Sequence, residues 1–293
     1  MEKLTWFPAD GSETITFSAN DEEFMLKSLE GVGDTSVDPV SDKGPLQLGE
    51  TFLTPRVDPK TITIQVGVLG DTPEEHMLLR QKLSGAMVVM MGQALELSEP
   101  GVLRYERYNL PPLEIEAVPV DSPSYTRRGG PANTVADIEL WCPFPYWRST
   151  EDSTRIIEEV GGVEYSLSYP LEYTEIRRAA LIENEGTAPV QPRFIIHGEI
   201  VNPVILNVTT GQALELETSI GSGERVEIDT RFGRKSVKKY SEENEESNAF
   251  PSLILDNSEF FALERGVNEI TLEGSPNVDG QLVVSWRELV GGV

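Results

Sequence analysis

The sequence predicts a mainly β protein in two parts: an N-terminal β-sandwich or split-barrel-like domain with one α-helix, and a C-terminal antiparallel β-sandwich. Short apolar segments of four to six residues, separated by Gly, Asn, Pro or Asp, run from Leu181 to Trp286. This spacing is too short for ordinary helices and is typical of antiparallel strands packed as two sheets. In the first half, residues 61–68 alternate at the period of a strand, and one helical pattern with a start signal follows them.

The chain is long enough for two domains, each with its own core. It has 293 residues, of which 39% are hydrophobic and 25% charged, the composition of a folded globular protein. We place the boundary after residues 142–150, where Pro143 and Pro145 stand among three aromatic residues and make a stiff, extended segment. The predicted domains are therefore residues 1–150 and 151–293, with residues 151–176 as a connector that already contains strands of the second domain.

The first domain opens with short strands. Residues 14–17 place Ile15 and Phe17 on one face, and residues 24–26 begin another strand. Residues 31–50 are rich in Gly, Asp, Ser and Pro with little periodicity, which predicts a long loop or arm that gains order from a neighbour. The next strand alternates without interruption, so its four apolar residues point to one buried side: Ile62, Ile64, Val66 and Val68.

The helix is predicted over about residues 72–91. Thr72 can cap it, Pro73 fits the first helical position, and Glu75 completes a capping box. An apolar stripe for core packing follows at helical spacing: Leu79, Leu83, Ala86, Met87 and Met90. The helix should stop near Gly92, and strands return at residues 113–117 and 135–141.

The second domain contains two predicted hairpins. One joins residues 203–208 to 213–216 around Gly211, and the other joins residues 225–230 to 236–240. Further apolar segments at residues 181–184, 194–198, 260–263 and 266–270 complete the sandwich, and residues 241–248 read as an exposed acidic loop.

The net charge of −25 argues against nucleic-acid and anionic membrane binding. It is −11 up to Thr150, from 12 basic and 23 acidic residues, and −14 beyond it, from 12 and 26. A solvated acidic surface explains this, and so would a surface that DNA must pass without sticking. One basic cluster is expected to pair with carboxylates of the same or a neighbouring subunit: Arg231, Arg234, Lys235, Lys238 and Lys239.

Nothing in the sequence predicts catalysis, so we expect no catalytic, cofactor-binding or metal-ligating residue and no enzyme activity. His76 and His197 are the two histidines and have the setting of solvated or structural residues. Phosphate loops, dinucleotide fingerprints, nucleophile elbows, zinc spacings and calcium loops are absent from the sequence. A glycosidase-type carboxylate pair stays open, because the carboxylates are too many to choose between.

Cys142 is the single cysteine and lies among apolar residues, where a buried small hydrophobe is expected. No charged-then-apolar leader follows Met1, and the longest apolar stretch, residues 86–91, is too short to cross a bilayer. Synthesis and folding in a reducing cytoplasm follow as an expectation.

Taken together, the motifs resemble those of the phage distal tail protein family, whose members form the hub at the tip of long, non-contractile tails. The first half contributes Trp6, Gly11, Thr54-Pro55-Arg56, the helix with Arg80, and Pro145-Tyr146-Trp147-Arg148. The second half contributes Ile182 to Pro189, Gly198, Asn202-Pro203, Thr210-Gly211, Gly223-Glu224, Ile228-Asp229-Thr230, Phe261-Ala262-Leu263 and Gly266-Val267-Asn268. The order and spacing of these pieces, over almost the whole chain, carry the resemblance.

The resemblance implies a structural virion protein of a phage or prophage, assembled in the host cytoplasm and located at the tail tip. In that family the N-terminal β-domain forms a homo-hexameric ring that joins the tail tube to the tail-tip or lysin protein. The C-terminal domain is a galectin-like sandwich that supports receptor-binding or other baseplate proteins. DNA would pass through the bore without specific binding, and no membrane is involved. Residues 31–50 are then a candidate arm for the contact with the adjacent subunit or the tube.

Two other functions remain open from the sequence. A sandwich of this kind can act as a carbohydrate-binding, lectin-like adhesion module through exposed aromatic residues. A cell-wall polysaccharide hydrolase is the other alternative, and polymer turnover would reveal it.

Overall fold

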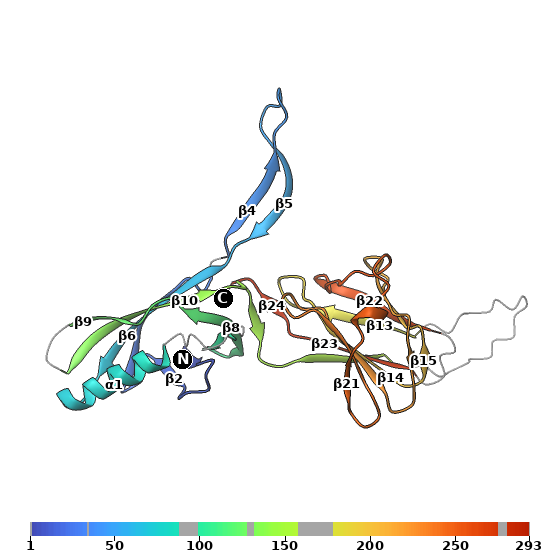
Figure 1. Ribbon diagram of the computed structural model, residues 1–293. Helices are drawn as coiled ribbons and strands as arrows, with labels where there is room; N and C mark the ends of the chain where they lie inside the picture. The colour runs from blue at the N-terminus through green and yellow to red at the C-terminus, as the bar shows by residue number, and fades with distance from the viewer. Residues whose placement is uncertain are drawn as a thin grey trace, which may run out of the picture. The chain divides into compact units, whose positions relative to one another are not determined.

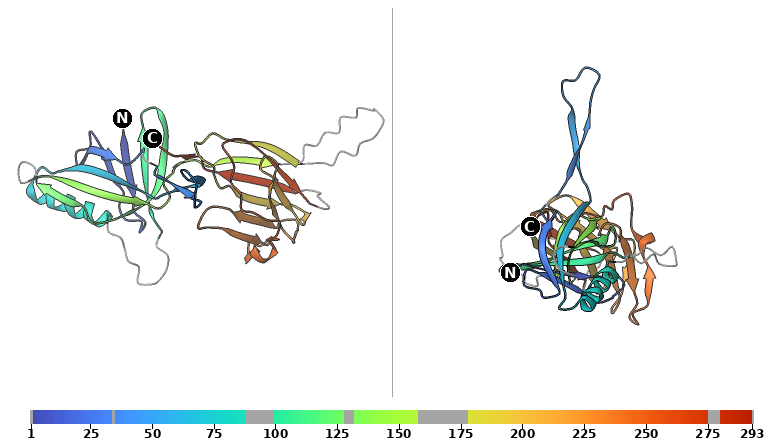
Figure 2. Two further views of the ribbon diagram at one scale, coloured as in Figure 1. Left: turned by 90° about the horizontal axis from the view of Figure 1, so that it is seen from above. Right: turned by 90° about the vertical axis from the view of Figure 1, so that its left-hand side faces the viewer.

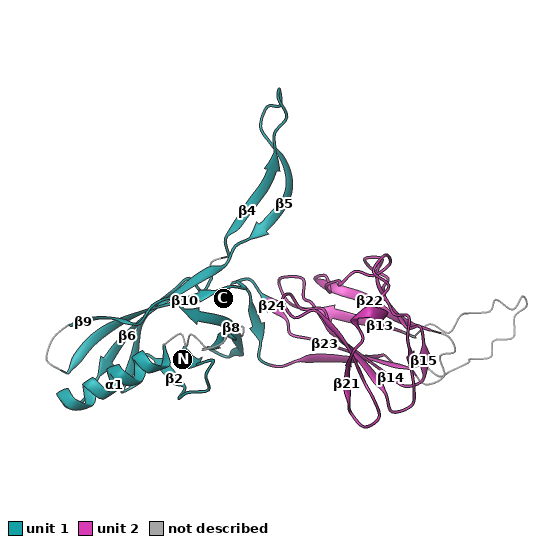
Figure 3. Ribbon diagram, in the orientation of Figure 1, with its two compact units in different colours: residues 1–150, 290–293 teal, residues 151–289 magenta. Residues whose placement is uncertain are grey.

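A computed structural model describes residues 2–33, 35–87, 99–127, 132–157, 178–274 and 280–292 (Figure 1). Strands dominate, and α1 (Pro73–Ala86) is the one α-helix among these residues, so the predicted fold class is confirmed. The chain divides into two compact units (Figure 3). The first comprises Met1–Thr150 with Val290–Val293, and the second comprises Glu151–Leu289. The last residues, predicted in the second domain, thus belong to the first unit.

A ten-stranded sheet forms the body of the first unit. Its order is β24-β11-β8-β7-β1-β2-β3-β6-β10-β9, and an additional pairing of β8 with β10 closes seven of these strands into a barrel. The bounds are β1 (Lys3–Phe7), β2 (Ile15–Ser18), β3 (Phe24–Glu30), β6 (Lys60–Leu69), β7 (Gly101–Arg107), β8 (Leu110–Pro119), β9 (Ser124–Arg127), β10 (Asn133–Cys142), β11 (Trp147–Ser149) and β24 (Leu289–Val290). Closure removes the free edges that β8 and β10 would otherwise expose.

Strand β6 supplies the inner wall of the barrel. Ile62, Ile64, Val66 and Val68 are all fully buried, as their alternation predicts. β6 pairs with β10 from Leu69↔Asn133 to Lys60↔Cys142, which fixes the register that keeps these four residues inside. Ile15 and Phe17 of β2 lie in the same core and confirm their predicted shared face.

Helix α1 begins as predicted. The Thr72 Oγ1 accepts a 3.2 Å hydrogen bond from the Glu75 backbone N–H, and the Glu75 carboxylate accepts one of 2.9 Å from Asp71, one residue before the cap. Four residues of the predicted stripe are buried in the core: Leu79, Leu83, Ala86 and Met87. The helix ends at Ala86, earlier than the predicted residue 91, and the Met87 backbone N–H donates to the Ser84 carbonyl. Met90 and Gly92 lie outside the described residues.

The predicted loop at residues 31–50 is instead half of a β-hairpin. β4 (Val37–Asp42) pairs with β5 (Thr51–Val57) in a separate two-stranded sheet. We call residues 37–57 the arm, which extends away from the barrel (Figure 1, and Figure 2, right). Its order comes from cross-strand pairing with residues 51–57, which periodicity within residues 31–50 cannot reveal.

The second unit is built from antiparallel sheets. A six-stranded sheet has the order β12-β23-β14-β19-β20-β21, a four-stranded sheet the order β13-β22-β16-β17, and β15 pairs with β18 (Figure 2, left). The bounds are β12 (Ser153–Ile157), β13 (Arg178–Asn184), β14 (Arg193–His197), β15 (Ile200–Val201), β16 (Val204–Asn207), β17 (Gln212–Glu215), β18 (Ser219–Ile220), β19 (Arg225–Asp229), β20 (Ser236–Tyr240), β21 (Glu246–Asn248), β22 (Gly266–Glu273) and β23 (Gln281–Trp286), with a short 3-10 helix at Phe250–Ser252. One apolar face of each sheet is buried, as in a sandwich.

The two predicted hairpins are confirmed as β16–β17 and β19–β20, and Gly211 takes the positive φ of +78° that the first turn requires. Two expectations are wrong. Residues 260–263 form no strand: burial alternates along them, with Phe261 and Leu263 inside, but Leu263 pairs with Val190 in a single bridge and no ladder continues from it. The predicted loop 241–248 ends in β21, which pairs with β20.

Candidate assembly surfaces

The arm has no apolar core of its own. All its β4 residues are exposed, and so is every β5 residue except Val57, which is half-buried. Large apolar side chains on it are nevertheless in solvent: Val37, Val40, Leu46, Leu48, Phe52 and Leu53. Isolated two-stranded hairpins are marginally stable in water, and exposed apolar patches of this kind mark interaction sites. The arm is therefore the first candidate for an assembly contact.

The two faces of the arm differ. Val37 pairs with Val57, Pro39 with Pro55 and Ser41 with Phe52, so one face is largely apolar. The opposite face holds the pair Asp38 and Arg56, joined by a 3.2 Å ion pair. A register shift near Val40 inserts Leu53 as an extra residue. The apolar face has the pattern of a strand pair that packs against something, and the charged face that of a surface left in water.

The base of the arm is anchored to the barrel. Lys60 at the start of β6 is buried, and its Nζ donates a 3.2 Å hydrogen bond to the Val32 carbonyl. The buried indole of Trp147 donates to the same oxygen at 2.9 Å. On the other side, Thr35 donates through Oγ1 to the Gly291 carbonyl at 2.5 Å. These contacts fix the direction in which the arm leaves the barrel.

A second surface lies along the outer side of α1. Leu78, Gln81, Lys82 and Gly85 follow one another at helical spacing and line a groove of about 480 Å³ with residues 12–13, which we call the α1 groove. Leu78 is 65% exposed, although its neighbour Leu79 is buried. Lys82 bridges Glu13 at 3.0 Å and Glu23 at 3.3 Å, which raises the pKa of its ammonium group.

Gly85 has no local reason to be glycine. It lies within α1, its φ is not positive, and a Cβ added there would meet nothing within 4 Å. Glycine inside a helix costs about 1 kcal/mol relative to alanine. Among the residues that the structure describes, the space beside Gly85 is therefore open.

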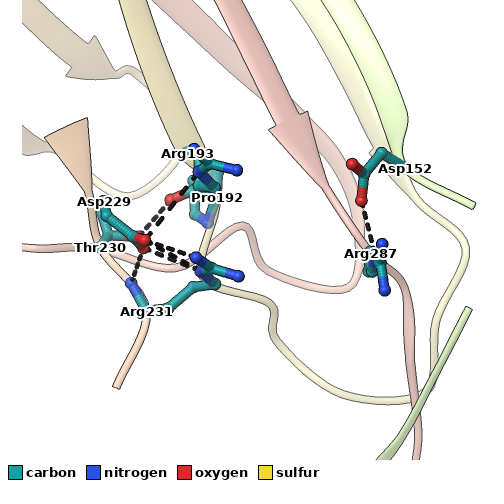
Figure 4. A network of polar contacts seen from close by, with 7 residues as sticks. All are labelled: Asp152, Pro192, Arg193, Asp229, Thr230, Arg231 and Arg287. Carbon is teal, nitrogen blue, oxygen red and sulfur yellow. Dashed lines mark hydrogen bonds and ion pairs between the residues drawn. The ribbon is translucent and has the colours of Figure 1, made fainter. Parts of the chain in front are cut away.

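The outer face of the six-stranded sheet in the second unit is polar. Arg225 stacks on Tyr240 at 4.1 Å and binds Glu227 at 2.8 Å, and a shallow crevice of about 180 Å³ runs beside them over β14, β19 and β20. At one end, Asp229 accepts hydrogen bonds from Arg231, while Thr230 donates to the Pro192 carbonyl (Figure 4). Burial raises the pKa of Asp229, but the hydrogen bonds and charge of Arg231, together with the charge of Arg193, outweigh it and leave the pKa below its ordinary value.

The predicted pairing of the basic cluster within the subunit is confirmed for three of its five residues. Arg231 pairs with Asp229 at 2.6 Å, Lys238 with Glu246 at 2.8 Å, and Lys239 with Glu224 at 2.8 Å. Lys235 lies over the ring of Phe260. Carboxylates of the same unit thus balance the charge of Arg231, Lys238 and Lys239.

The two histidines and the single cysteine are all at least partly buried. His76 is buried in the first turn of α1, where its Nε2 lies 3.0 Å from the Thr134 hydroxyl. His197 is half-buried on β14. Cys142 is fully buried, and burial raises the pKa of its thiol to about 12. Among the described residues there is no group of three or more His, Cys, Asp or Glu side chains placed to hold a metal ion, and no helix long and apolar enough to span a membrane.

Comparison with protein families identifies the second unit. Residues 185–289 match the family model of the siphovirus-type tail component, C-terminal domain. The second unit carries this domain. The resemblance to phage distal tail proteins predicted from the sequence is thereby confirmed for residues 185–289. The curated proteins contain no match to the chain.

Solved structures extend the likeness of fold to the whole chain. Its fold is similar to that of the SPP1 Dit (gp 19.1) protein, described as a paradigm of the hub adsorption apparatus in phages that infect Gram-positive bacteria, with a TM-score of 0.66, 10% identity, and coverage of 98% of this chain and 99% of that one. It is also similar to a chain of the phage p2 baseplate in its activated conformation with Sr, with a TM-score of 0.54, 12% identity and full coverage of both chains. The same baseplate with Ca gives a TM-score of 0.53 at 12% identity. At these identities the likeness shows the fold.

The arm tip is the part of the candidate surface that sequence reasoning missed. Leu46 and Leu48 stand within a segment bounded by Gly44-Pro45 and Gly49, where composition and lack of periodicity predict an arm but do not single out either leucine. Two leucines between turn residues, in a stretch with no other core-forming pattern, are the signal that could have identified them.

Proposed function

We propose that this chain is a non-enzymatic structural protein of the distal tail, or baseplate hub, of a long-tailed phage or related particle. Six copies close into a ring that joins the tail tube to the tail-tip proteins, with the second unit available to adhesion proteins. The observation that carries the proposal is the fold shared with the SPP1 hub protein over 98% of the chain, together with the tail-component domain at residues 185–289.

The surfaces of the chain support a connecting role. A ring of identical subunits needs two different patches on each copy that fit one another. The arm and the α1 groove are two candidate patches of this kind on the first unit, and the described residues of that unit leave both open. A net charge of −25 suits a ring around passing DNA, because a negative wall repels phosphates over a Debye length of about 8–10 Å without closing the bore.

Solution mass tests the proposal. Light scattering on the purified chain should give six times the 32.4 kDa chain mass, and negative-stain images should show rings with a central opening. A chain that stays monomeric at all concentrations and hydrolyses peptidoglycan or polysaccharide would overturn it. A glycan-array signal from a monomer would favour the adhesion module instead.

A further inference from the structure

The tip of the arm exposes two leucines completely. Leu46 is 98% exposed and Leu48 101%, in the turn between β4 and β5. Lys43 stands beside them and makes no ion pair among the residues that the structure describes. Two exposed leucines with a lysine near them in sequence are complementary to an apolar groove with acidic walls, because the leucines can fill the groove and the ammonium group can pair with a carboxylate.

Two prolines decide how the arm can bind. Pro39 and Pro55 lie opposite each other in the middle of β4 and β5. Proline has no backbone N–H to offer an incoming strand, and its presence on an edge blocks edge-to-edge pairing. Both outer edges of the arm are therefore interrupted. The arm is suited to docking through its side chains and not to extending a neighbour's sheet.

The α1 groove has the complementary features. Its wall is the exposed Leu78, and Gly85 opens its floor to close approach. Glu13 and Glu75 line it, and Lys82, the one cation among its described lining residues, is already bound by two carboxylates. The groove therefore combines an apolar surface with a negative rim, opposite in sign to Lys43.

We propose that the α1 groove receives the arm tip of a second copy of this chain, with Leu46 and Leu48 inside it and Lys43 against its acidic rim. This contact rests on the proposed function, because it is the heterologous joint that would close the ring. The groove of the same copy is excluded as the site, since the arm leaves the barrel away from α1 (Figure 1; Figure 2, right). A second copy is favoured over a different acidic protein because this one sequence supplies both the apolar, basic arm tip and the apolar groove with an acidic rim.

Cysteine cross-linking between two variants tests the contact directly. Leu48→Cys is mixed with Leu78→Cys, so that a short bis-maleimide can join the two sites only across copies. The native thiol of Cys142 is buried and does not compete. The matched control mixes Leu48→Cys with Leu110→Cys, an exposed leucine of β8 that does not line the groove. We expect a cross-linked dimer from the first mixture and only background cross-linking from the second.

Substitutions at Leu48 and Lys43 test the same contact independently, through their effect on assembly. Leu48→Glu is expected to raise the protein concentration at half-assembly about tenfold or more, the effect of losing one buried leucine. Lys43→Glu should also weaken assembly, whereas Lys27→Glu, an exposed lysine of β3, should leave it unchanged. Thermal unfolding of each variant shows that the chain still folds.

The outcomes separate this contact from the ring itself. Suppose that the wild type is hexameric but Leu48→Cys and Leu78→Cys cross-link no better than the control pair, or that Leu48→Glu leaves assembly unchanged. Either result overturns the proposed docking and leaves the proposed function standing. A wild type that stays at the mass of one chain overturns the proposed function. Capture of the arm tip by another tail protein in place of the groove would also count against a second copy as the occupant.

Discussion

The indole nitrogen of Trp147 donates a 2.9 Å hydrogen bond to the carbonyl oxygen of Val32, which joins β11 to the chain that leads into the arm. Lys60 donates to the same oxygen and lies 5.4 Å from the centre of the Trp147 ring. One carbonyl thus gathers three segments that are far apart in the sequence. The position of the arm depends on this point.

Replacing Trp147 with Phe should lower the free energy of unfolding by about 1–2 kcal/mol, because a buried hydrogen bond is lost while most apolar contact remains. Chemical denaturation followed by circular dichroism measures the change. Trp141→Phe is the matched control, since Trp141 is 43% exposed on β10 and should change stability by no more than about 0.5 kcal/mol. Equal losses in both variants would mean that the bond to Val32 contributes nothing.

Stability should fall as the pH drops below about 6.5. Burial, followed by the charges of Arg80 and Arg127, lowers the pKa of His76 below its ordinary value of 6.5. The unfolded chain therefore takes up a proton at a higher pH than the folded chain, and the stability present above pH 6.5 is lost as the pH falls toward the folded value.

The midpoint of urea unfolding, measured between pH 8 and 5.5, checks this dependence, and His76→Gln should flatten it. His197 contributes in the same direction, because burial and Arg225 lower its pKa too. His197→Gln therefore measures how much of the pH dependence of stability comes from His197. A wild-type profile that is flat over this range would contradict both assignments.

Cys142 should not react with thiol reagents in the folded protein. Its side chain is fully buried and its pKa is raised to about 12 by burial, so both access and thiolate are lacking at pH 8. Titration with a chromogenic disulfide should give no release under native conditions and one equivalent in denaturant. Rapid release from the folded chain would show that β10 opens locally.

Asn184 should be among the most sensitive positions of the second unit. Its buried amide donates to the carbonyls of Ala188 and Leu263 and accepts from the Gly186 backbone N–H. Asn184→Ala leaves these groups without partners and should cost about 2–4 kcal/mol. Asn257→Ala, which removes one exposed contact with Glu215, should cost less than about 0.5 kcal/mol in the same unfolding assay. Similar losses would contradict the role of Asn184 as a connector.

Local sequence patterns are sufficient to predict the elements whose apolar residues recur at a single strand or helix period. β6 alternates strictly because one of its faces lines the barrel, and α1 carries its cap, its proline and its stripe within fifteen or so residues. The closure of the barrel cannot be predicted from local patterns, because it depends on the pairing of Leu140 in β10 with Pro119 in β8, which are far apart in the sequence. The strand at Val37–Asp42 was missed for the same reason, because its order comes from residues 51–57.

The candidate surfaces were predictable in kind and not in detail. An unperiodic, Gly- and Pro-rich stretch indicated an arm, and an isolated basic cluster with many carboxylates nearby indicated internal pairing, which Arg231 and Asp229 confirm. The exposed leucines of the tip and the open position at Gly85 needed coordinates, because exposure depends on what the rest of the chain leaves uncovered.

β24 has a consequence for synthesis on the ribosome. It adds the outermost strand beside β11, yet it is translated only after the whole second unit. The Thr35 contact with Gly291 forms at the same late moment. A chain whose synthesis has not reached Gly291 therefore has the other barrel strands but lacks the hydrogen bond that Thr35, just before the arm, makes with this residue.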